Sequence, residues 1–324
     1  MRTAPRSFAL ARFAAALLAL AASACAKPPS IAAPVLAPVI SSPSASIAED
    51  AGTMDPPAVP APAESVAPPS MSMPEVPEPP PFAAAPRAEV RAVVLVYHLF
   101  GGMDTEMAVE PAAFEQQLAW LVDHHIAVIG TSDLVSFLAG ERDLPARAAV
   151  IQIDDGHVST HGKAFPALLR HGLRFTLALN TEAIEGHRPE AVTWDAVREM
   201  LSSGLCEIAS HSHIHGHMDR LTDARNQSEA MLSRSILEAR TGVRPEAFVY
   251  PFGGNDKRVR HTIEDAGYRA AFGVSGGAAR ASSPRFEVPR IGVTRSMSLT
   301  AFARLFGETV REARAGGART AGRG

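Results

Sequence analysis

The 324-residue sequence is long enough for one large domain or two smaller ones, and 46% of its residues are apolar. Its 31 basic and 34 acidic residues nearly cancel, so the charge gives no reason to expect binding to nucleic acid or to an anionic membrane surface. The chain has only two cysteines, so it can form at most one intramolecular disulfide.

Residues 1–24 have the features of an export signal. Three arginines precede the apolar run from Phe13 to Ala22, which is too short to span a bilayer comfortably. The small residues Ala22 and Ala24 suit ordinary signal-peptide cleavage and secretion. The segment that ends at Cys25 also resembles a bacterial lipoprotein signal, in which Cys25 becomes the lipidated first residue. We favour the lipoprotein interpretation, which predicts an envelope protein held at a membrane, in the periplasm or on the outer membrane if the cell has two.

Cys206 is the other cysteine, and it lies in an apolar segment. If Cys25 carries a lipid, no intramolecular disulfide can form. We therefore expect Cys206 to be a small buried apolar residue and not a nucleophile.

The predicted domain plan places a linker over residues 25–88. This stretch holds most of the chain's 26 prolines, mixed with alanine, serine and valine. Such a composition has little to bury, and proline lacks an amide donor, so we expect an extended, disordered tether. A folded domain is predicted over residues 89–315 and a flexible tail over 316–324.

Strands and helices alternate through the folded domain. Apolar runs predict strands buried on both faces at 92–97, 127–129, 148–153, 175–179, 205–209, 247–250 and 268–274. Helices are predicted at about 114–122, 133–138, 164–171, 194–201, 224–240, 256–266 and 299–313. The alternation implies a parallel sheet, and the number of strands favours a closed or nearly closed (β/α) barrel over an open doubly wound sheet. In such barrels the chemistry lies where strands end and loops begin.

Two adjacent aspartates, Asp154 and Asp155, follow the strand predicted at 148–153. Adjacent carboxylates repel each other and resist ionising together, and a nearby cation removes that conflict. An acidic turn with Gly156 at a positive dihedral angle explains the same residues equally well. The pair alone therefore leaves both interpretations open.

Four histidines occupy alternate positions after the strand predicted at 205–209, namely His211, His213, His215 and His217. If the segment turns helically, His211 and His215 share one face at a spacing that suits two ligands of one metal ion. If it is extended, all four rings line one face. A solvent-exposed polar loop and a metal-storage tract are the alternatives. Two histidines and one carboxylate would leave the open coordination position that catalytic zinc requires.

The sequence segments that follow several predicted strands together resemble the motifs of a known family. The segments Asp154–Gly156, His211–His215 and Tyr250–Gly253 match, in order and spacing, the first three motifs of the polysaccharide deacetylases, the NodB-homology domains of carbohydrate esterase family 4. The resemblance covers roughly residues 93–310 and includes Leu95–His98. It implies a distorted (β/α) barrel of the NodB type that binds one divalent metal ion, often zinc, and removes acetyl groups from N-acetylated sugars.

The resemblance also implies roles for the motif residues. Asp155, His211 and His215 would bind the metal ion, which we expect to be zinc, although cobalt, nickel and manganese suit the same ligands. Asp154 would be the general base, and the backbone N–H of Phe252 would stabilise the oxyanion.

The sequence departs from most family members at the general acid. A catalytic histidine usually follows the third motif, but here the only later histidine is His261, inside a predicted helix. His98 is therefore the candidate acid, an arrangement that resembles the branch acting on the biofilm polymer poly-β-1,6-N-acetylglucosamine. Arg290 is a candidate to hold Asp154 in place, although a surface arginine explains it equally well. Other candidates for substrate contact or support of the site are Tyr97, His157 and Tyr250, and we expect His213 and His217 on the pocket rim.

The predicted function is metal-dependent de-N-acetylation of a polysaccharide that contains N-acetylglucosamine, with poly-β-1,6-N-acetylglucosamine as the first expectation and peptidoglycan or chitin oligomers as alternatives. An esterase of O-acetylated glycans would need the same metal and base but less from the acid. A non-catalytic carbohydrate-binding lipoprotein would not need Asp154. A metal-buffering protein would bind several ions through residues 211–217.

Overall fold

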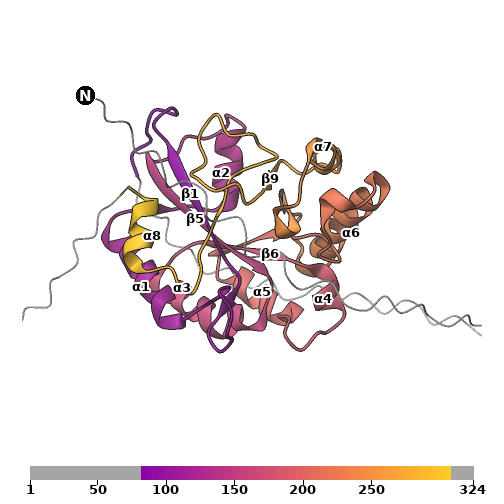
Figure 1. Cartoon of the computed structure of the whole chain (residues 1–324), viewed down its shortest axis with the longest axis horizontal. Helices are drawn as coiled ribbons and strands as arrows, with labels where there is room; N and C mark the ends of the chain where they lie inside the picture. The colour runs from indigo at the N-terminus through magenta and orange to yellow at the C-terminus, as the bar shows by residue number, and fades with distance from the viewer. Residues whose placement is uncertain (1–81, 308–324) are drawn as a thin grey trace, which may run out of the picture. The chain divides into compact units, whose positions relative to one another are not determined.

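The computed structural model describes residues 82–307, which form a curled parallel sheet with helices packed around it (Figure 1). Within this range the sheet has eight strands in the order β10-β1-β5-β6-β7-β8-β9, with β4 paired to β5 beside this path. These strands are β1 (Arg91–Tyr97), β4 (Ala127–Val128), β5 (Arg147–Asp155), β6 (Phe175–Leu179), β7 (Cys206–Ser210), β8 (Ala247–Val249), β9 (Ala270–Phe272) and β10 (Ile291–Gly292). A separate small sheet joins β2 (Leu99–Phe100) to β3 (Ala108–Val109).

Local sequence signals explain where the helices begin and end. The helices are α1 (Pro111–Asp123), α2 (Thr131–Leu138), α3 (Phe165–His171), α4 (Thr181–Glu185), α5 (Trp194–Ser202), α6 (Asp223–Thr241), α7 (Lys257–Asp265) and α8 (Leu299–Leu305). Several begin after a side chain that accepts a hydrogen bond from a backbone N–H of the first turn, at Asn180, Thr193, Thr222, Asp256 and Ser298. α3 and α6 each end at a glycine in the left-handed conformation, Gly172 and Gly242.

Side chains of the strands alternate between two sides of the sheet. On the outer side, Ile151 of β5 packs in a large apolar cluster with side chains of α1, α3, α5 and α8. On the inner side, Ala148 and Val150 of the same strand join residues of β1, β6, β7, β8 and β9 in a second cluster. The inner series of β5 continues with Gln152 and Asp154, which are both buried. The alternation therefore carries polar residues into the interior of the curled sheet, toward the carboxyl ends of its strands.

The curled sheet has a seam between β9 and β10. In the described range these two strands do not pair, and the chain between them crosses the gap. Phe272 of β9 bridges Val288, and Ala92 of β1 bridges Ala279. The predicted distorted (β/α) barrel is therefore confirmed, with its strands nearly but not fully closed.

Most predicted strands and helices are present, with ends shifted by a few residues. The short elements β2, β3, α4 and β10 were not predicted, because two to five residues give too little periodicity to recognise. The last helix was predicted over 299–313, but α8 ends at Leu305 and Gly307 follows with a φ of 79°. Glycine adopts this left-handed conformation readily, so it ends the helix early. The rest of that prediction lies beyond the described residues.

Residues just before the predicted start of the domain at residue 89 contact the folded domain. The N–H of Ala85 donates to the carbonyl of Leu144 at 3.0 Å. The guanidinium of Arg87 lies 4.3 Å from the centroid of the Phe137 ring. Residues from Ala85 onward therefore contact the folded domain, within the segment that was predicted as linker. The contact of Arg87 with Phe137 is of the cation–π kind. The predicted signal over residues 1–24, Cys25, the linker up to residue 81 and the tail over 316–324 lie outside the described residues.

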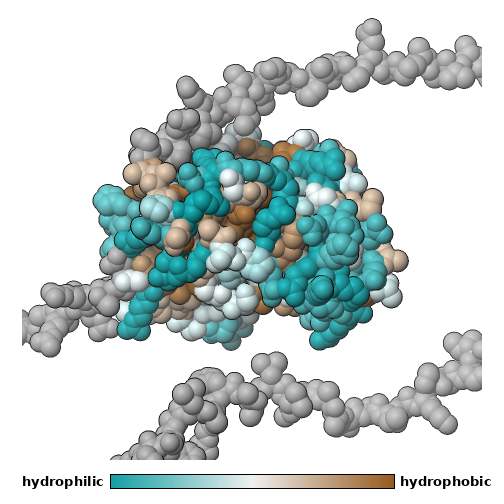
Figure 2. Space-filling model, turned by 90° about the horizontal axis from the view of Figure 1, so that it is seen from above, coloured by the Kyte–Doolittle hydropathy of each residue, from teal (hydrophilic) through white to brown (hydrophobic). Residues whose placement is uncertain are grey.

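Across residues 82–307, every helix is too short or too polar to span a membrane. On the face shown in Figure 2, hydrophilic residues predominate and hydrophobic residues occur in small groups. Cys206 is buried, as predicted, and burial raises the pKa of its thiol well above the usual value. A thiol in this environment is not a nucleophile at neutral pH.

Candidate active site

Reactive side chains from three strands meet at the carboxyl end of the curled sheet. His98 follows β1, Asp154 and Asp155 end β5, and His211 follows β7. They line one pocket of about 310 Å³. Other residues that line it include Met107, His215, Phe252, Val274, Arg290 and Val293.

Three of these side chains form a compact group that fits a metal ion. Oδ1 of Asp155 lies 3.4 Å from Nε2 of His211 and 3.1 Å from Nε2 of His215. The two Nε2 atoms are 3.1 Å apart. Within the described part of the chain, Asp155 Oδ1 is buried and has no hydrogen-bond partner. Three converging ligand atoms with an orphaned carboxylate oxygen among them fit one shared divalent cation.

The hydrogen bonding of His211 supports this assignment. Its Nδ1 lies 2.8 Å from the carbonyl oxygen of Val249, a group that can only accept. Nδ1 therefore carries the proton in the neutral ring, which leaves the lone pair of Nε2 directed at Asp155 and His215. The backbone of β8 thus fixes both the tautomer and the orientation of this ligand.

The segment after β7 is neither helical nor extended, so neither geometry considered from the sequence is correct. Ser212 and His215 have positive φ angles of 63° and 57°. The hydroxyl of Ser212 accepts a hydrogen bond from the N–H of His215 at 3.0 Å. This tight turn brings the rings of His211 and His215 together, with centroids 4.7 Å apart.

Glu229 of α6 stabilises this turn by hydrogen bonds to its backbone. Sequence reasoning did not identify this residue. Its Oε2 accepts hydrogen bonds from the N–H groups of His213 and Ile214, at 2.9 and 2.8 Å. The side chain is buried and paired with Arg225 at 3.0 Å. The signal in the sequence is weak: an acidic residue on the face of a helix that otherwise buries small and apolar side chains.

Asp154 lies beside the group of metal-ligand candidates but is held separately. Its Oδ1 accepts a hydrogen bond from Nη1 of Arg290 at 2.9 Å, and both side chains are almost fully buried. Its Oδ2 lies 3.9 Å from Nε2 of His98 and 3.9 Å from Nε2 of His211. Burial disfavours its ionised form, but the charge of Arg290, followed by His211 and His98, outweighs this and lowers the pKa of Asp154. Arg290 is thus not a surface arginine, and it keeps a buried carboxylate ionised next to the pocket.

His98 also lies close to Asp154, with its Nε2 3.9 Å from Oδ2 of the carboxylate. Burial lowers the pKa of His98, and the nearby carboxylates of Asp154 and Asp155 only partly oppose this effect. The ring lines the pocket and remains partly accessible. A histidine in this position can transfer a proton to a group bound in the pocket.

Comparison with known proteins agrees with this geometry. Residues 141–271 match the family model described as polysaccharide deacetylase. This range contains Asp154, Asp155, His211 and His215. The chain therefore carries a polysaccharide deacetylase domain.

Relatives of the deacetylase agree in family and fold. It is 24% identical over 209 residues to the putative polysaccharide deacetylase YxkH of Bacillus subtilis, a match covering 64% of this chain and 74% of that protein. It is 25% identical over 237 residues to the poly-beta-1,6-N-acetyl-D-glucosamine N-deacetylase of Escherichia coli K12, covering 61% of this chain but only 35% of that protein. The deacetylase thus spans about a third of the length of the E. coli relative. The Streptococcus pyogenes deacetylase PplD, solved in complex with acetate, has the same fold, with a TM-score of 0.64, 19% identity, and coverage of 67% of this chain and 98% of that one.

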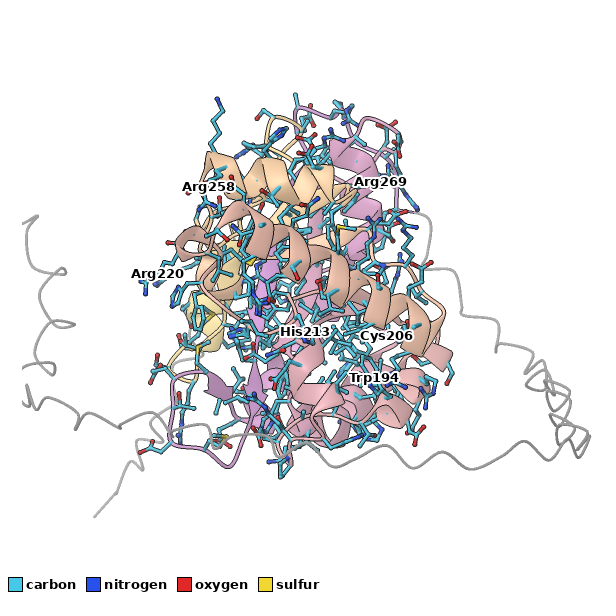
Figure 3. All side chains as sticks on the ribbon, turned by 90° about the vertical axis from the view of Figure 1, so that its right-hand side faces the viewer. Trp194, Cys206, His213, Arg220, Arg258 and Arg269 are labelled. Atoms are coloured by element: carbon cyan, nitrogen blue, oxygen red, sulfur yellow. The ribbon has the colours of Figure 1, made fainter. Side chains whose placement is uncertain are left out.

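Phe252 forms part of the rim of the deacetylase pocket. Its side chain is 58% exposed, and its backbone has a positive φ of 58°. The ring of His217 stacks on it with centroids 4.1 Å apart, and His215 meets its edge. His217 thus lies against the rim. His213 does not: it is absent from the pocket lining, and its Nδ1 bonds to the hydroxyl of Thr181 in α4 at 2.9 Å (His213 is labelled in Figure 3).

Tyr97 and Tyr250, which were candidates for substrate contact or for support of the site, do not line the pocket. Tyr97 is fully buried on the outer side of β1, where its hydroxyl donates to Gln117 at 2.9 Å. Neighbouring strand residues point to opposite sides, so His98 faces the pocket and Tyr97 cannot. Tyr250 is also fully buried, and its hydroxyl donates to the carbonyl of Phe286 at 3.0 Å. Both tyrosines are core residues, so of the two predicted roles only support of the site fits their burial.

His157 lies next to the deacetylase pocket without lining it. Its Nδ1 bonds to the hydroxyl of Ser159 at 2.7 Å, and the same hydroxyl accepts the N–H of Phe100 at 3.1 Å. Burial lowers the pKa of His157. Through Ser159, His157 is therefore connected to β2.

Proposed function

We propose that this polysaccharide deacetylase removes acetyl groups from N-acetylglucosamine units of poly-β-1,6-N-acetylglucosamine, and that the reaction depends on one divalent metal ion. The proposal is carried by one observation: Asp155, His211 and His215 converge on a common point, while Asp154 lies beside this group and is held by Arg290. The E. coli relative, whose name specifies this polymer, supports the choice of substrate.

The metal ion would be held by Asp155, His211 and His215, and zinc is the ion that two imidazoles and a carboxylate favour in catalytic sites. Cobalt, nickel and manganese bind the same ligand types. When bound, such an ion acts as a Lewis acid that acidifies water and polarises an acetamide carbonyl.

Asp154 is the general base in this proposal. Its Oδ2 faces the pocket, while its Oδ1 is occupied by Arg290. The lowered pKa keeps the carboxylate ionised, so it can accept the proton of the attacking water. The backbone N–H of Phe252, a residue that lines the pocket, would stabilise negative charge on the carbonyl oxygen of the substrate.

His98 is the general acid. An amine is a poor leaving group and must receive a proton as the C–N bond breaks. His98 lines the same pocket as His211 and His215. Because its pKa is lowered, its protonated form is a stronger acid than an ordinary imidazolium.

The test compares amine release from poly-β-1,6-N-acetylglucosamine, peptidoglycan and chitin oligomers, with a chelator and after zinc is restored. We expect the highest kcat/KM on poly-β-1,6-N-acetylglucosamine, loss of activity with the chelator, and recovery with zinc. A higher kcat/KM on peptidoglycan or chitin oligomers would contradict the proposal that poly-β-1,6-N-acetylglucosamine is the substrate. Release of O-linked acetyl groups without amine release would identify a glycan esterase.

The variant Asp154→Asn tests the role of Asp154 as the general base. We expect it to bind zinc as the wild-type protein does and to lose roughly 10²–10⁴-fold in kcat, the usual contribution of a general base. Normal turnover by the zinc-loaded variant would show that another group accepts the proton.

We also propose that the protein is exported and anchored in the cell envelope through a lipid on Cys25. The support is the sequence of residues 1–25, with its arginines, short apolar run and cysteine. Radiolabelled palmitate should enter the wild-type protein and not the Cys25→Ser variant. Absence of label from the wild-type protein would contradict lipid attachment and leave secretion as the alternative.

A further inference from the structure

A buried amide lies directly beneath the catalytic base. Gln152 is on β5, two residues before Asp154, on the same inner side of the sheet. Its side chain is fully buried. Burying an amide is costly unless its hydrogen bonds are satisfied, so this polar residue needs partners that an apolar side chain would not.

Both ends of the Gln152 amide are hydrogen-bonded. Its Oε1 accepts from Nη1 of Arg290 at 3.1 Å. Its Nε2 donates to the hydroxyl of Thr131, the first residue of α2, at 3.0 Å. The hydroxyl of Thr131 in turn lies 2.8 Å from that of Thr176 on β6. All of these side chains are buried, so water does not compete for their bonds.

The partners fix the direction of the amide. Arg290 can only donate, so the amide must present its oxygen to the guanidinium. Thr131 accepts from the nitrogen at the other end, which prevents the amide from rotating by half a turn. The chain Thr176–Thr131–Gln152 therefore gives Arg290 a fixed acceptor deep in the sheet.

Arg290 is held by two neutral acceptors and one charged one. Its Nε donates to the carbonyl of Gly273 at 2.9 Å, and its Nη1 is shared between Gln152 and Asp154, at 3.1 and 2.9 Å. The Nη1 atom that contacts the base is thus also the atom that Gln152 contacts. If the glutamine oxygen were removed, the guanidinium could tilt, and Asp154 would lose its fixed position.

We propose that Gln152 is a positioning residue for the reaction: it holds Arg290 at the angle that keeps Asp154 aimed into the pocket, and it acts on the base only through Arg290. This inference rests on the proposed function. Gln152 touches neither the pocket nor the candidate metal ligands, so its effect should fall on turnover and not on binding.

The central test is Gln152→Met, which keeps the length of the side chain and removes both polar atoms. We expect kcat on the acetylated polymer to fall roughly 10–100-fold, since small misplacements of catalytic groups cost this much. KM and the affinity for zinc should stay within a factor of about two or three, because neither site is touched. The matched control is Gln117→Met, the same change in another buried glutamine, which bonds to Tyr97 on the outer side and should leave kcat unchanged.

A double-mutant cycle with Arg290→Met separates positioning from a general loss of packing. If Gln152 acts through Arg290, then Gln152→Met will change kcat little in the Arg290→Met background. Equal factors in both backgrounds would overturn the proposal, as would an unchanged kcat in Gln152→Met or a change confined to KM or zinc affinity.

Thr131→Val provides a second variant should Gln152→Met fail to fold. This variant removes the hydroxyl that fixes the direction of the Gln152 amide. We expect kcat to fall less than in Gln152→Met, with KM unchanged. An unchanged kcat in Thr131→Val would count against the proposal. If the wild-type protein releases no amine from any acetylated glycan, the proposed function itself fails, which is a different result from an active enzyme that does not depend on Gln152.

Discussion

At the scale of single residues, the two neighbouring aspartates show how the backbone separates two roles. Asp154 continues the inner series of β5 and meets Arg290. Asp155 would point outward by alternation, but its positive φ of 70° turns the chain and directs its carboxylate to the histidines. One carboxylate is therefore available to a metal ion and the other to a proton.

His98→Ala tests the division between acid and base. We expect hydrolysis of the N-acetylated polymer to fall by roughly 10²–10³-fold, because an amine must be protonated to leave. Hydrolysis of an activated aryl acetate by the same variant should fall much less, because a phenolate leaves without a proton. The two substrates are compared by kcat on zinc-loaded protein. Equal losses on both would contradict the role of His98 as an acid.

Sequence reasoning named the residues that meet at the candidate site, and Arg290 as a possible support, but it did not name Glu229 or Gln152. Asp154, Asp155, His211 and His215 stand in short motifs at strand ends, so order and spacing were enough to find them. The role of Arg290 could not be decided, because it contacts Asp154 across 136 positions of sequence. The sequence also could not separate the two roles considered for Tyr97 and Tyr250, which lie beside motif residues but face the core.

At the scale of elements, the turn after β7 depends on α6. Glu229 accepts two backbone N–H groups of the turn that carries His211 and His215. No local pattern predicts positive φ angles at Ser212 and His215, because a contact from a distant helix stabilises them. This is why the sequence left the geometry of the histidine segment open.

Glu229→Gln should weaken metal binding without removing a ligand. An uncharged amide accepts the two N–H groups less strongly than a carboxylate does. We expect zinc affinity to fall roughly 10–100-fold, as for other residues that support metal ligands. Titration calorimetry measures this, with Glu238→Gln, an exposed position on the same helix, as the control. The same zinc affinity in both variants would show that the turn does not need Glu229.

The contact between α4 and α6 predicts a pH-dependent stability. Hydrogen bonds from Arg240 and Trp194 lower the pKa of Glu185 from its ordinary value of 4.5, against the smaller opposing effect of burial. A lowered pKa in the folded state stabilises the fold above pH 4.5, and this contribution is lost as the pH falls through the folded-state pKa.

Glu185→Gln should therefore have a lower Tm than the wild type at pH 7, by only about a few degrees because the ion pair is largely exposed. The difference should shrink as the pH falls below 4.5. Thermal unfolding followed by circular dichroism from pH 3 to 7 tests this. A difference in Tm that stays constant with pH would mean that the charge of Glu185 does not stabilise the fold.

At the scale of the whole molecule, alternation of apolar strands and helices was enough to predict the barrel. The long buried strands β1, β5 and β6 are visible as continuous apolar runs. The seam between β9 and β10 was not predictable, because β10 is only two residues long and pairs with β1 from the far end of the chain. That seam matters for the site, since Arg290 enters the interior immediately before β10.

The central claim is that one divalent cation is shared by Asp155, His211 and His215, with Asp154 left unbound beside it. Anomalous diffraction at the zinc edge, from crystals grown with zinc, tests this directly. We predict a single strong peak in the pocket, about 2.0–2.2 Å from Nε2 of both histidines and from an oxygen of Asp155, with Asp154 outside the coordination shell. A zinc peak that lies elsewhere, or one bound by Asp154 in place of Asp155, would contradict the account.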